Sequence, residues 1–413
     1  MKNNDKTIHL VVIGGCGHVG LPLGLAFASK GVHVTLLDIN EQAVAAINQG
    51  KIPFQEEGAQ EILDSHLHKN LFITSDDSVV DSADVVCFIT GTPIDEHLNP
   101  RVQDIIKIIR HYEKHLNPRQ LIILRSTIYP GTTRVIENIL QNESQVKKLA
   151  FCPERIQEGK GICEIFSLPQ LVSATSPEAE QEAVALFSKI TKKTIVLSPE
   201  EAELAKLMTN SWRYLQFAIA NQFYMMATEF GYDFHKIFAA MTEDYPRARS
   251  FARPGLAAGP CLFKDTMQIA AFHKHHFHLG HSAMLVNEGL PSCLVDQMSR
   301  QFDGNLKHRK IAIMGMTFKA DNDDTRESLS FKIKKLLEEV DVYIIPSVNP
   351  DGGAFDVATG RYRMWRKNTR KLPDGNIGVD LNRNYDSYWC QQGASHSTGA
   401  DTYCGPAPFS EPE

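Results

Sequence analysis

The sequence lacks an excess of positive charge. Its 413 residues include 43 lysines and arginines against 49 aspartates and glutamates, which gives a formal net charge of −6. A protein that binds nucleic acid through the phosphates needs a basic surface, so we expect no nucleic-acid partner. The chain also lacks an apolar run close to the roughly 18 residues of a membrane-spanning helix, so we expect no membrane partner.

The N-terminal residues lack the apolar segment and small-residue cleavage site of a secretory signal peptide. Six of the eight cysteines are scattered without the spacing of a metal site, as is typical of a reduced intracellular enzyme. Both observations predict a cytoplasmic location. Cys390 and Cys404 lie close together near the C-terminus and could form a disulfide in an oxidising compartment, which would set this segment apart from the rest.

The order of apolar runs predicts an α/β protein with several domains, since 413 residues are too many for one ordinary core. Over residues 1–197, buried strands alternate with helices, which predicts a Rossmann-like doubly wound parallel sheet. Residues 198–302 are mostly helical, with Ser198 as the N-cap of a long helix and acidic residues in its first turn. This stretch predicts a central helical domain.

The pattern changes twice more. Residues 303–340 restart with a strand, a loop and a helix, which predicts the truncated start of a second nucleotide-binding domain. Residues 341–413 are rich in Asn, Gly, Pro, Ser, Tyr and Arg. The stretch "DVYIIPSV" follows a helix, so we expect it to lie parallel to "IAIMGM" in a βαβ unit.

The stretch "IGGCGHVG" places Gly15-x-Gly17-x-x-Gly20 between a strand and a helix. Gly15 allows the tight turn, Gly17 lets a pyrophosphate approach the backbone, and Gly20 allows close helix packing. Asp38 ends the next strand, where an acidic residue binds a ribose diol and repels a 2′-phosphate. The spacing predicts a dinucleotide site that prefers NAD to NADP; the alternative is a glycine-rich structural turn.

Three separated segments carry chemically suggestive side chains. They are "CPERIQEGK", "ELAKLMTN" and "GPCLFKDT", with Glu154 and Glu158, Lys206 and Asn210, and Cys261, Lys264 and Asp265, respectively. The spacing of Lys206 and Asn210 predicts that both lie on one helix face. A thiol beside a lysine is a candidate nucleophile, because positive charge favours the thiolate. Alternatively, the cysteine is a small core residue and the helix residues are solvated or structural.

Residues 8 to about 340 resemble the nucleotide-sugar 6-dehydrogenases, the family of UDP-glucose and UDP-N-acetylmannosamine dehydrogenases. The resemblance rests on seven motifs in the family's order: "VIGGCGHVGLPLG", "GTPIDEHLNP", "RSTIYPGTT", "FCPERIQEGK", "AELAKLMTNSWRYLQFAIANQF", "GPCLFKDT" and "GMTFKADNDDTRES". It implies an NAD-dependent, four-electron oxidation of the sugar C6 hydroxyl to a carboxylate.

The resemblance also implies roles for individual residues. Cys261 would attack the aldehyde and form a thioester, with Lys206 and Asn210 stabilising the oxyanion. Asp265 with Lys206 would supply the base, and Thr127 with Glu154 would orient the hydrolytic water. The implied cofactor-binding residues are Gly15, Gly17, His18, Val19, Gly20, Asp38, Thr92 and Thr127. The implied substrate-binding residues are Glu154, Glu158, Lys206, Asn210, Arg253, Lys319 and Arg326.

The substrate and the assembly follow less directly. "CPERI", "GK" and "EIFSLPQLVSA" are more similar to the N-acetylhexosamine branch of the family, which favours UDP-N-acetylmannosamine or UDP-N-acetylglucosamine over UDP-glucose. Pro260, next to Cys261, departs from the family's glycine-rich run, so the shape of this loop stays open. The family's long central helix commonly forms a homodimer interface; the apolar "LQFAIANQFYMMA" fits one, and an intrachain core explains it equally well.

Residues 341–413 resemble a different family, the zinc metallocarboxypeptidases related to carboxypeptidase T. The resemblance rests on "VNPDGGAFDVATGRYRMWRKNTRK", "GVDLNRNYDSYW" and "TYCGPAPFSEPE". It implies that Arg366 polarises the scissile carbonyl and that Asn382 and Arg383 hold the substrate's carboxylate.

The family takes two zinc ligands from an H-x-x-E motif, and no such motif occurs in the chain. A catalytic zinc needs three protein ligands, so we expect no metal and no peptidase activity. The histidine-rich segment "HKHHFHLGH" lacks thiols or carboxylates at ligand spacing, so we interpret it as a solvated helix end or loop, with adventitious metal binding as the less favoured alternative. The sequence thus leaves three interpretations: an active dehydrogenase with an unrelated tail, an inactive chimera, and, less favoured without zinc or a complete core, a peptidase-type module that binds carboxylates.

Overall fold

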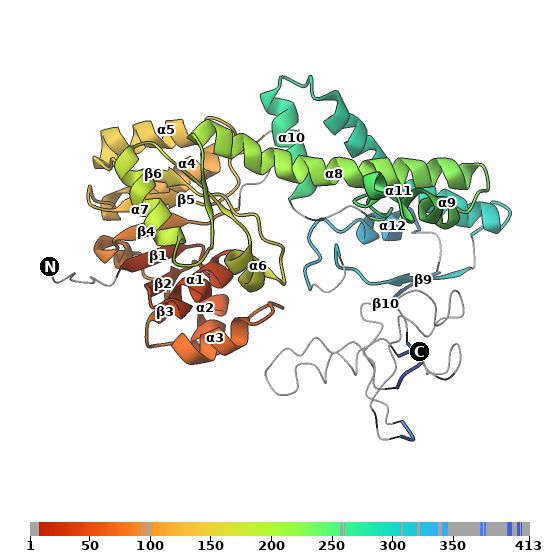
Figure 1. The fold of residues 1–413 in the computed structure, drawn as a ribbon, viewed down its shortest axis with the longest axis horizontal. Coiled ribbons are helices and arrows are strands. Elements are labelled where there is room, and N and C mark those ends of the chain that lie inside the picture. The colour runs from red at the N-terminus through yellow and green to blue at the C-terminus, as the bar shows by residue number, and fades with distance from the viewer. Residues whose placement is uncertain are drawn as a thin grey trace. The chain divides into compact units, whose positions relative to one another are not determined.

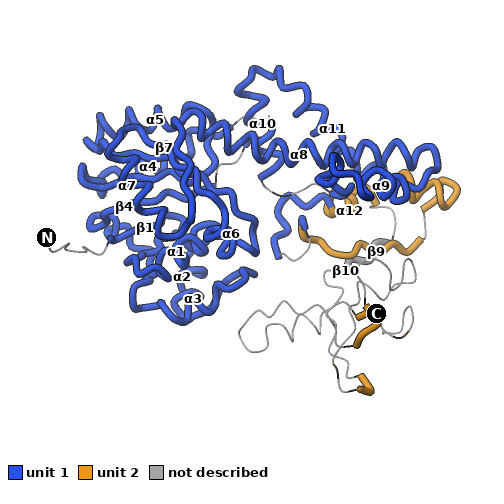
Figure 2. Tube along the Cα trace, in the orientation of Figure 1, with its two compact units in different colours: residues 1–293, 318–329 blue, residues 294–317, 330–413 orange. Residues whose placement is uncertain are grey.

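The computed structural model describes residues 8–91, 94–95, 100–256, 259, 261–306, 309–319, 323–337 and 341–345, with short pieces at 372–374, 376, 395–398, 403–404 and 406. The chain divides into two compact units (Figure 2). The first unit comprises residues 1–293 and 318–329, and the second comprises residues 294–317 and 330–413. Thr92, Arg366, Asn382 and Arg383 lie outside the described residues.

An eight-stranded sheet forms the centre of the first unit, in the order β3-β2-β1-β4-β5-β6-β7-β8. Its strands are β1 His9–Ile13, β2 His33–Leu37, β3 Leu71–Thr74, β4 Val85–Phe88, β5 Leu121–Leu124, β6 Leu149–Phe151, β7 Gln170–Ala174 and β8 Thr194–Val196. The predicted α/β fold is therefore confirmed. One pair departs from the expected parallel sheet, because β7 runs antiparallel to β6.

Helices cover both faces of this sheet (Figure 1). They are α1 Gly20–Ser29, α2 Glu41–Asn48, α3 Ala59–His66, α4 Val102–Tyr112, α5 Thr132–Ile139, α6 Gly161–Ser167 and α7 Pro177–Phe187. One apolar cluster includes Phe27 and Phe187 from α1 and α7. A second cluster includes Ile109 and Ile136 from α4 and α5. Because strands such as β4 and β5 are buried along their whole length, their sequences are continuous apolar runs.

A 31-residue helix, α8 Pro199–Glu229, begins the helical part of the chain. Its N-terminus is a capping box, in which the Ser198 hydroxyl accepts from the Glu201 backbone and the Glu201 carboxylate accepts from the Ser198 backbone. The predicted N-cap is confirmed. The helices that follow are α9 Phe234–Thr242, α10 Leu262–Phe272 and α11 His278–Gln301. α10 packs along α8 through Tyr214 and Phe263, whose ring centroids lie 6.3 Å apart.

In the second unit, β9 Lys310–Met314, α12 Ser330–Leu336 and β10 Asp341–Ile345 follow one another. β10 pairs with β9 in parallel, from Asp341 opposite Lys310 to Ile345 opposite Met314. The pairing predicted for "DVYIIPSV" is therefore confirmed. A small core of Ile313, Met316 and Leu337 joins the strand to the helix. The change in composition at Asp341 thus falls inside one βαβ unit.

Two further features bear on the predictions from sequence. Cys404 is disulfide-bonded, whereas Cys390 lies outside the described residues. The six cysteines from Cys16 to Cys293 do not form disulfides. Among the described helices, none combines the length and the apolar character that crossing a membrane requires. Within the described ranges, no group of three or more His, Cys, Asp or Glu side chains is arranged to hold a metal ion.

Candidate active site

The glycine-rich loop joins β1 to α1 and is closed by backbone hydrogen bonds. The amides of Gly14 and Gly15 both donate to the carbonyl of Leu37, at 2.9 and 3.1 Å. Gly14 has a φ of +76°, and a Cβ there would lie 1.8 Å from the carbonyl oxygen of Ile89. The left-handed turn is therefore at Gly14, not at Gly15 as the sequence suggested. Gly15 is required for a different reason, since its Cβ would lie 2.7 Å from that of Leu36.

The other two glycines behave as expected. A Cβ at Gly20 would lie 2.3 Å from the carbonyl oxygen of Gly14, so α1 begins in close contact with the loop. Gly17 is exposed, and a Cβ there would meet only the Gly14 oxygen, at 3.9 Å. The backbone is thus open at Gly17, beside the N-terminus of a ten-residue helix whose first amides can bind phosphate. This geometry fits a dinucleotide.

Asp38 is tied to the same loop. Its carboxylate accepts from the backbone amide of Cys16 at 2.9 Å and from that of Asn40 at 3.0 Å. Asp38 is half-buried at the end of β2, the position expected for the residue that contacts a ribose. It therefore holds the shape of the glycine-rich loop as well as presenting a negative charge beside it.

His18 and Val19 lie half-buried at the start of α1. The His18 ring stacks on Phe54, with centroids 4.1 Å apart. Burial lowers the pKa of His18, and the nearby positive charge of Arg326 lowers it further. The imidazole is therefore neutral at physiological pH and serves as a flat, uncharged surface next to the glycine-rich loop.

The predicted face of α8 is confirmed. Lys206 and Asn210 are both buried. The Asn210 side-chain amide donates to the Asp265 Oδ2 on α10, at 2.6 Å. The Lys264 Nζ lies 3.6 Å from the Asp265 Oδ1, which makes no hydrogen bond to any residue that the structure describes. A fully buried carboxylate thus keeps one oxygen available next to a lysine.

Cys261 occupies the N-cap position of α10, one turn before Asp265, and retains accessible surface. The dense protein surroundings of the sulfur raise the pKa of the Cys261 thiol, and the charge of Asp265 raises it further. Lys264 and Lys206 lower it, but they do not outweigh these effects. The two lysines favour the thiolate as expected, but the net direction of the shift is the opposite in the ligand-free protein.

Glu154 is engaged in a buried ion pair. Its Oε2 pairs with Arg125, and its Oε1 accepts from the backbone amides of Arg155 and Ile156. Arg125 is itself buried and also donates to the carbonyl of Cys152 at 3.1 Å. Thr127 lies half-buried in the loop between β5 and α5. The structure therefore gives Glu154 strong partners of its own.

Of the other predicted substrate-binding residues, Glu158, Lys319 and Arg326 form one group, and Arg253 lies apart from it. In this group, the Lys319 Nζ donates to the backbone carbonyl of Glu158 at 2.6 Å, and Arg326 pairs with the carboxylates of Glu158 and Asp324. The charge of Glu158 also raises the pKa of the Cys261 thiol, so this group lies within electrostatic range of the sulfur. Arg253 stands apart and stacks over Phe238, 5.3 Å from the ring centroid.

Two buried carboxylates were missed from the sequence. Glu203 accepts from the backbone amides of Gly131 and Thr133 and from the Thr133 hydroxyl. Glu56 accepts from the backbone amides of Gly159 and Ile162, and burial raises its pKa to about 7. For Glu203 a signal was present, because it lies three residues before Lys206 on the same helix face. Glu56 stands in a polar stretch that gives no such signal.

Comparison with known proteins identifies the family of two consecutive stretches of the chain, from the sheet domain into the helices after it. The NAD binding domain of the UDP-glucose/GDP-mannose dehydrogenase family matches residues 9–191, and the central domain of that family matches residues 200–289. Over these residues, the chain belongs to the UDP-glucose/GDP-mannose dehydrogenase family. It is therefore an oxidoreductase, and its cofactor is a nicotinamide dinucleotide.

Relatives of known name agree with this membership. A UDP-N-acetyl-D-mannosamine dehydrogenase of Methanococcus aeolicus is 26% identical over 334 residues, covering 79% of this chain and 75% of the relative. A UDP-glucose 6-dehydrogenase of Bacillus subtilis is 26% identical over 347 residues, covering 81% and 78%. The solved structure of a UDP-D-ManNAc dehydrogenase from Pyrococcus horikoshii superposes with a TM-score of 0.76 at 26% identity, covering 82% and 84%.

The last part of the chain matches another family. The zinc carboxypeptidase family matches residues 329–413, which confirms the resemblance of this segment. The match begins at Leu329, before the change in composition at Asp341. It therefore includes α12 and β10, the two elements that complete the βαβ unit with β9.

Proposed function

We propose that this chain is an NAD-dependent nucleotide-sugar 6-dehydrogenase, which oxidises the C6 hydroxyl of a UDP-sugar to a carboxylate through a thioester on Cys261. The observation that carries the proposal is the buried contact between Asn210 and Asp265, one helical turn from Cys261. It brings an amide donor, a carboxylate and a thiol together on two packed helices. When bound, the dinucleotide would supply the hydride acceptor that each of the two oxidations needs.

The residues around Cys261 suit the steps that the protein must perform. Asp265 has an oxygen without a hydrogen bond in the described structure, and it is the base that we propose for the thiol or the substrate hydroxyl. The thiolate then adds to the aldehyde carbon, forming a carbon–sulfur bond. Lys206 and Asn210 donate to the oxyanion that develops. Once the thiol–aldehyde adduct has been oxidised to the thioester, with its two electrons passed to a second oxidised dinucleotide, water would break the thioester and release the carboxylate and the thiol.

Asp38 supports NAD as the cofactor. Its two hydrogen bonds with backbone amides keep the carboxylate at the end of β2, next to the glycine-rich loop. A ribose diol would donate to this carboxylate, whereas a 2′-phosphate would be repelled by it. Gly15, Gly17, His18, Val19 and Gly20 would form the surface for the pyrophosphate. Thr127 follows β5, at the same edge of the sheet.

The substrate that we favour is UDP-N-acetylmannosamine or UDP-N-acetylglucosamine, with UDP-glucose as the alternative. Relatives with both kinds of name match the chain about equally well. Glu158, Lys319 and Arg326 would bind the nucleotide sugar, because they form a charged group within electrostatic range of Cys261. The proposed role of Glu154 is to orient water with Thr127. Its pairing with Arg125 makes a purely structural role the competing explanation.

We also propose a homodimer through α8. Five large apolar side chains on this helix and one at its C-cap are at least 40% exposed, and their spacing of three, four or seven residues places them in one stripe. They are Met208, Trp212, Ile219, Phe223, Met226 and Phe230. Sedimentation of the wild type and of Phe223→Glu tests this: the wild type should sediment as a dimer and the variant as a monomer. A monomeric wild type contradicts the homodimer.

The competing function is that of an inactive chimera. The observation that favours it is the partial cover of β9, of which Lys310, Ala312 and Met314 are exposed. An NADH-formation assay with UDP-N-acetylmannosamine, UDP-N-acetylglucosamine and UDP-glucose distinguishes the two. We expect NADH with one N-acetylhexosamine substrate. Binding of NAD without NADH formation from any of the three would favour the chimera.

A further inference from the structure

A buried carboxylate on α8 caps a different helix. Glu203 is 1% exposed, and its Oε1 accepts from the backbone amide and the hydroxyl of Thr133, at 2.8 and 2.6 Å. Its Oε2 accepts from the backbone amide of Gly131 at 2.6 Å. The two residues that supply these donors are at the N-terminus of α5, where the N-cap residue, Gly131, has no side chain of its own. Glu203 therefore supplies the negative cap that this helix lacks.

The position of Glu203 connects this cap to the candidate active site. Glu203, Lys206 and Asn210 stand at i, i+3 and i+7, so they share one face of α8. A rise of 1.5 Å per residue puts Lys206 about 4.5 Å and Asn210 about 10 Å further along the helix. Asn210 in turn holds Asp265 on α10, the helix that begins at Cys261. Two side-chain links, from Glu203 to α5 and from Asn210 to Asp265, thus join α5, α8 and α10, and Cys261 is the N-cap residue of α10.

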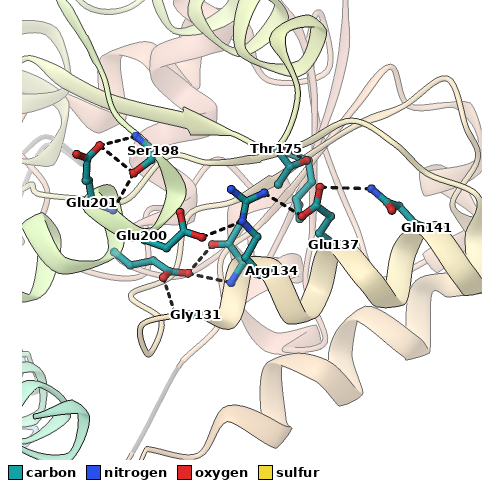
Figure 3. Close-up of polar contacts among 11 residues, drawn as sticks. Gly131, Arg134, Glu137, Gln141, Thr175, Ser198, Glu200 and Glu201 are labelled. Carbon is teal, nitrogen blue, oxygen red and sulfur yellow. Dashed lines mark hydrogen bonds and ion pairs between the residues drawn. The ribbon is translucent and has the colours of Figure 1, made fainter.

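A second link joins the same two helices at the surface. Arg134 on α5 pairs with Glu200 on α8 at 2.8 Å and with Glu137 at 3.0 Å (Figure 3). All three side chains are in contact with solvent, and exposed pairs of this kind contribute little to stability. Glu200 is therefore a matched control for Glu203, because it joins the same helices without being buried.

We propose that Glu203 is a positioning residue, which fixes the first turns of α8 against the N-terminus of α5 so that Lys206 and Asn210 face Cys261. The effect of Glu203 on catalysis rests on the function proposed above, whereas its effect on the reactivity of Cys261 can be measured whether or not that function is correct. Without Glu203, α8 loses three hydrogen bonds to α5 and can move, and both Lys206 and Asn210 move with it.

The test is the rate at which iodoacetamide alkylates Cys261, followed by mass spectrometry of its peptide, in the wild type, Glu203→Gln and Glu200→Gln. Glutamine has a similar shape, but its NH2 group cannot accept a hydrogen bond. Glu203→Gln therefore places a donor against the donors at the start of α5. Withdrawal of Lys206 removes a charge that favours the thiolate, and release of Asp265 from Asn210 exposes the thiol to more negative charge. Since only the thiolate reacts, we expect Glu203→Gln to slow alkylation about threefold or more and Glu200→Gln to leave it unchanged.

A variant with a smaller change keeps the test valid if Glu203→Gln does not fold. Thr133→Val removes only the hydroxyl donor and leaves the backbone amide, so we expect slower alkylation in the same direction with a smaller effect. Wild-type alkylation rates in a folded Glu203→Gln, or in Thr133→Val if that variant alone folds, would overturn the proposal. The measurement needs no substrate. A wild type that forms no NADH therefore counts against the proposed function and leaves the result for Glu203 intact.

Discussion

The side-chain amide of Asn210 on α8 donates a 2.6 Å hydrogen bond to the buried carboxylate of Asp265 on α10. We predict that Asn210→Ala destabilises the fold by about 1–3 kcal/mol, because Asp265 stays buried without this donor. Urea unfolding, followed by circular dichroism, measures the change. The exposed Thr209→Ala on the same helix is the control. An Asn210→Ala variant as stable as the control would show that the contact is not a stabilising one.

The thiol of Cys261 should react slowly at neutral pH. The dense protein surroundings of the sulfur and the charge of Asp265 raise its pKa above the ordinary value, which is about 8.5 in peptides. Because the thiolate fraction increases with pH, we expect the alkylation rate of Cys261 to keep rising above pH 9. The rate–pH profile of the ligand-free protein measures this. A midpoint of this rate–pH profile below pH 8 would mean that the two lysines lower the pKa of Cys261 by more than its surroundings and Asp265 raise it.

Glu56 should make stability depend on pH. Burial raises its pKa from 4.5 to about 7, so between these values the folded protein holds a proton that the unfolded chain releases. The free energy of unfolding should therefore fall as the pH rises from about 4.5 to 7, by at most about 3 kcal/mol. Glu56→Gln removes this titration.

The measurement for Glu56 is urea unfolding at pH 5 and pH 8. The difference between the free energies of unfolding at the two pH values should be smaller in Glu56→Gln than in the wild type. Glu57→Gln, whose side chain is exposed next to it, should leave the difference unchanged. Equal differences in all three proteins would mean that Glu56 is ionised throughout this range.

Asp38→Ala should weaken NAD binding and reduce the preference for NAD over NADP. The variant loses both the negative charge near the ribose and the acceptor for the Cys16 amide, so we expect at least about tenfold weaker binding of NAD. Calorimetric titration with each dinucleotide measures this. Glu41→Gln, an exposed acid in the first turn of α2, is the control. Unchanged discrimination in Asp38→Ala would place the ribose elsewhere.

The sequence predicts local structure well wherever the cause is local. Ser198 could be identified as an N-cap because its capping partner, Glu201, stands three residues away. Lys206 and Asn210 could be assigned to one helix face for the same reason. Gly14 shows the limit: three glycines fit the dinucleotide spacing, yet the positive φ falls on the one before them, because the loop must close onto Leu37.

Long-range contacts are harder to predict. Nothing near Glu203 in the sequence indicates that its partners, Gly131 and Thr133, lie about 70 residues earlier. The antiparallel β7 also follows from tertiary pairing with β6 and not from its own residues. The sign of the pKa shift of Cys261 was wrong for a related reason. The neighbouring lysine is visible in the sequence, whereas the dense protein surroundings that outweigh its charge are a property of the folded chain.

The stoichiometry of the reaction tests the central proposal most directly. It is the molar ratio of NADH formed to uronate formed from UDP-N-acetylmannosamine or UDP-N-acetylglucosamine, in the wild type and in Cys261→Ala. We predict two NADH per uronate in the wild type, and no uronate beyond trace amounts in the variant, because the second oxidation needs the thiol. Uronate formation by Cys261→Ala at close to the wild-type rate would contradict the thioester route.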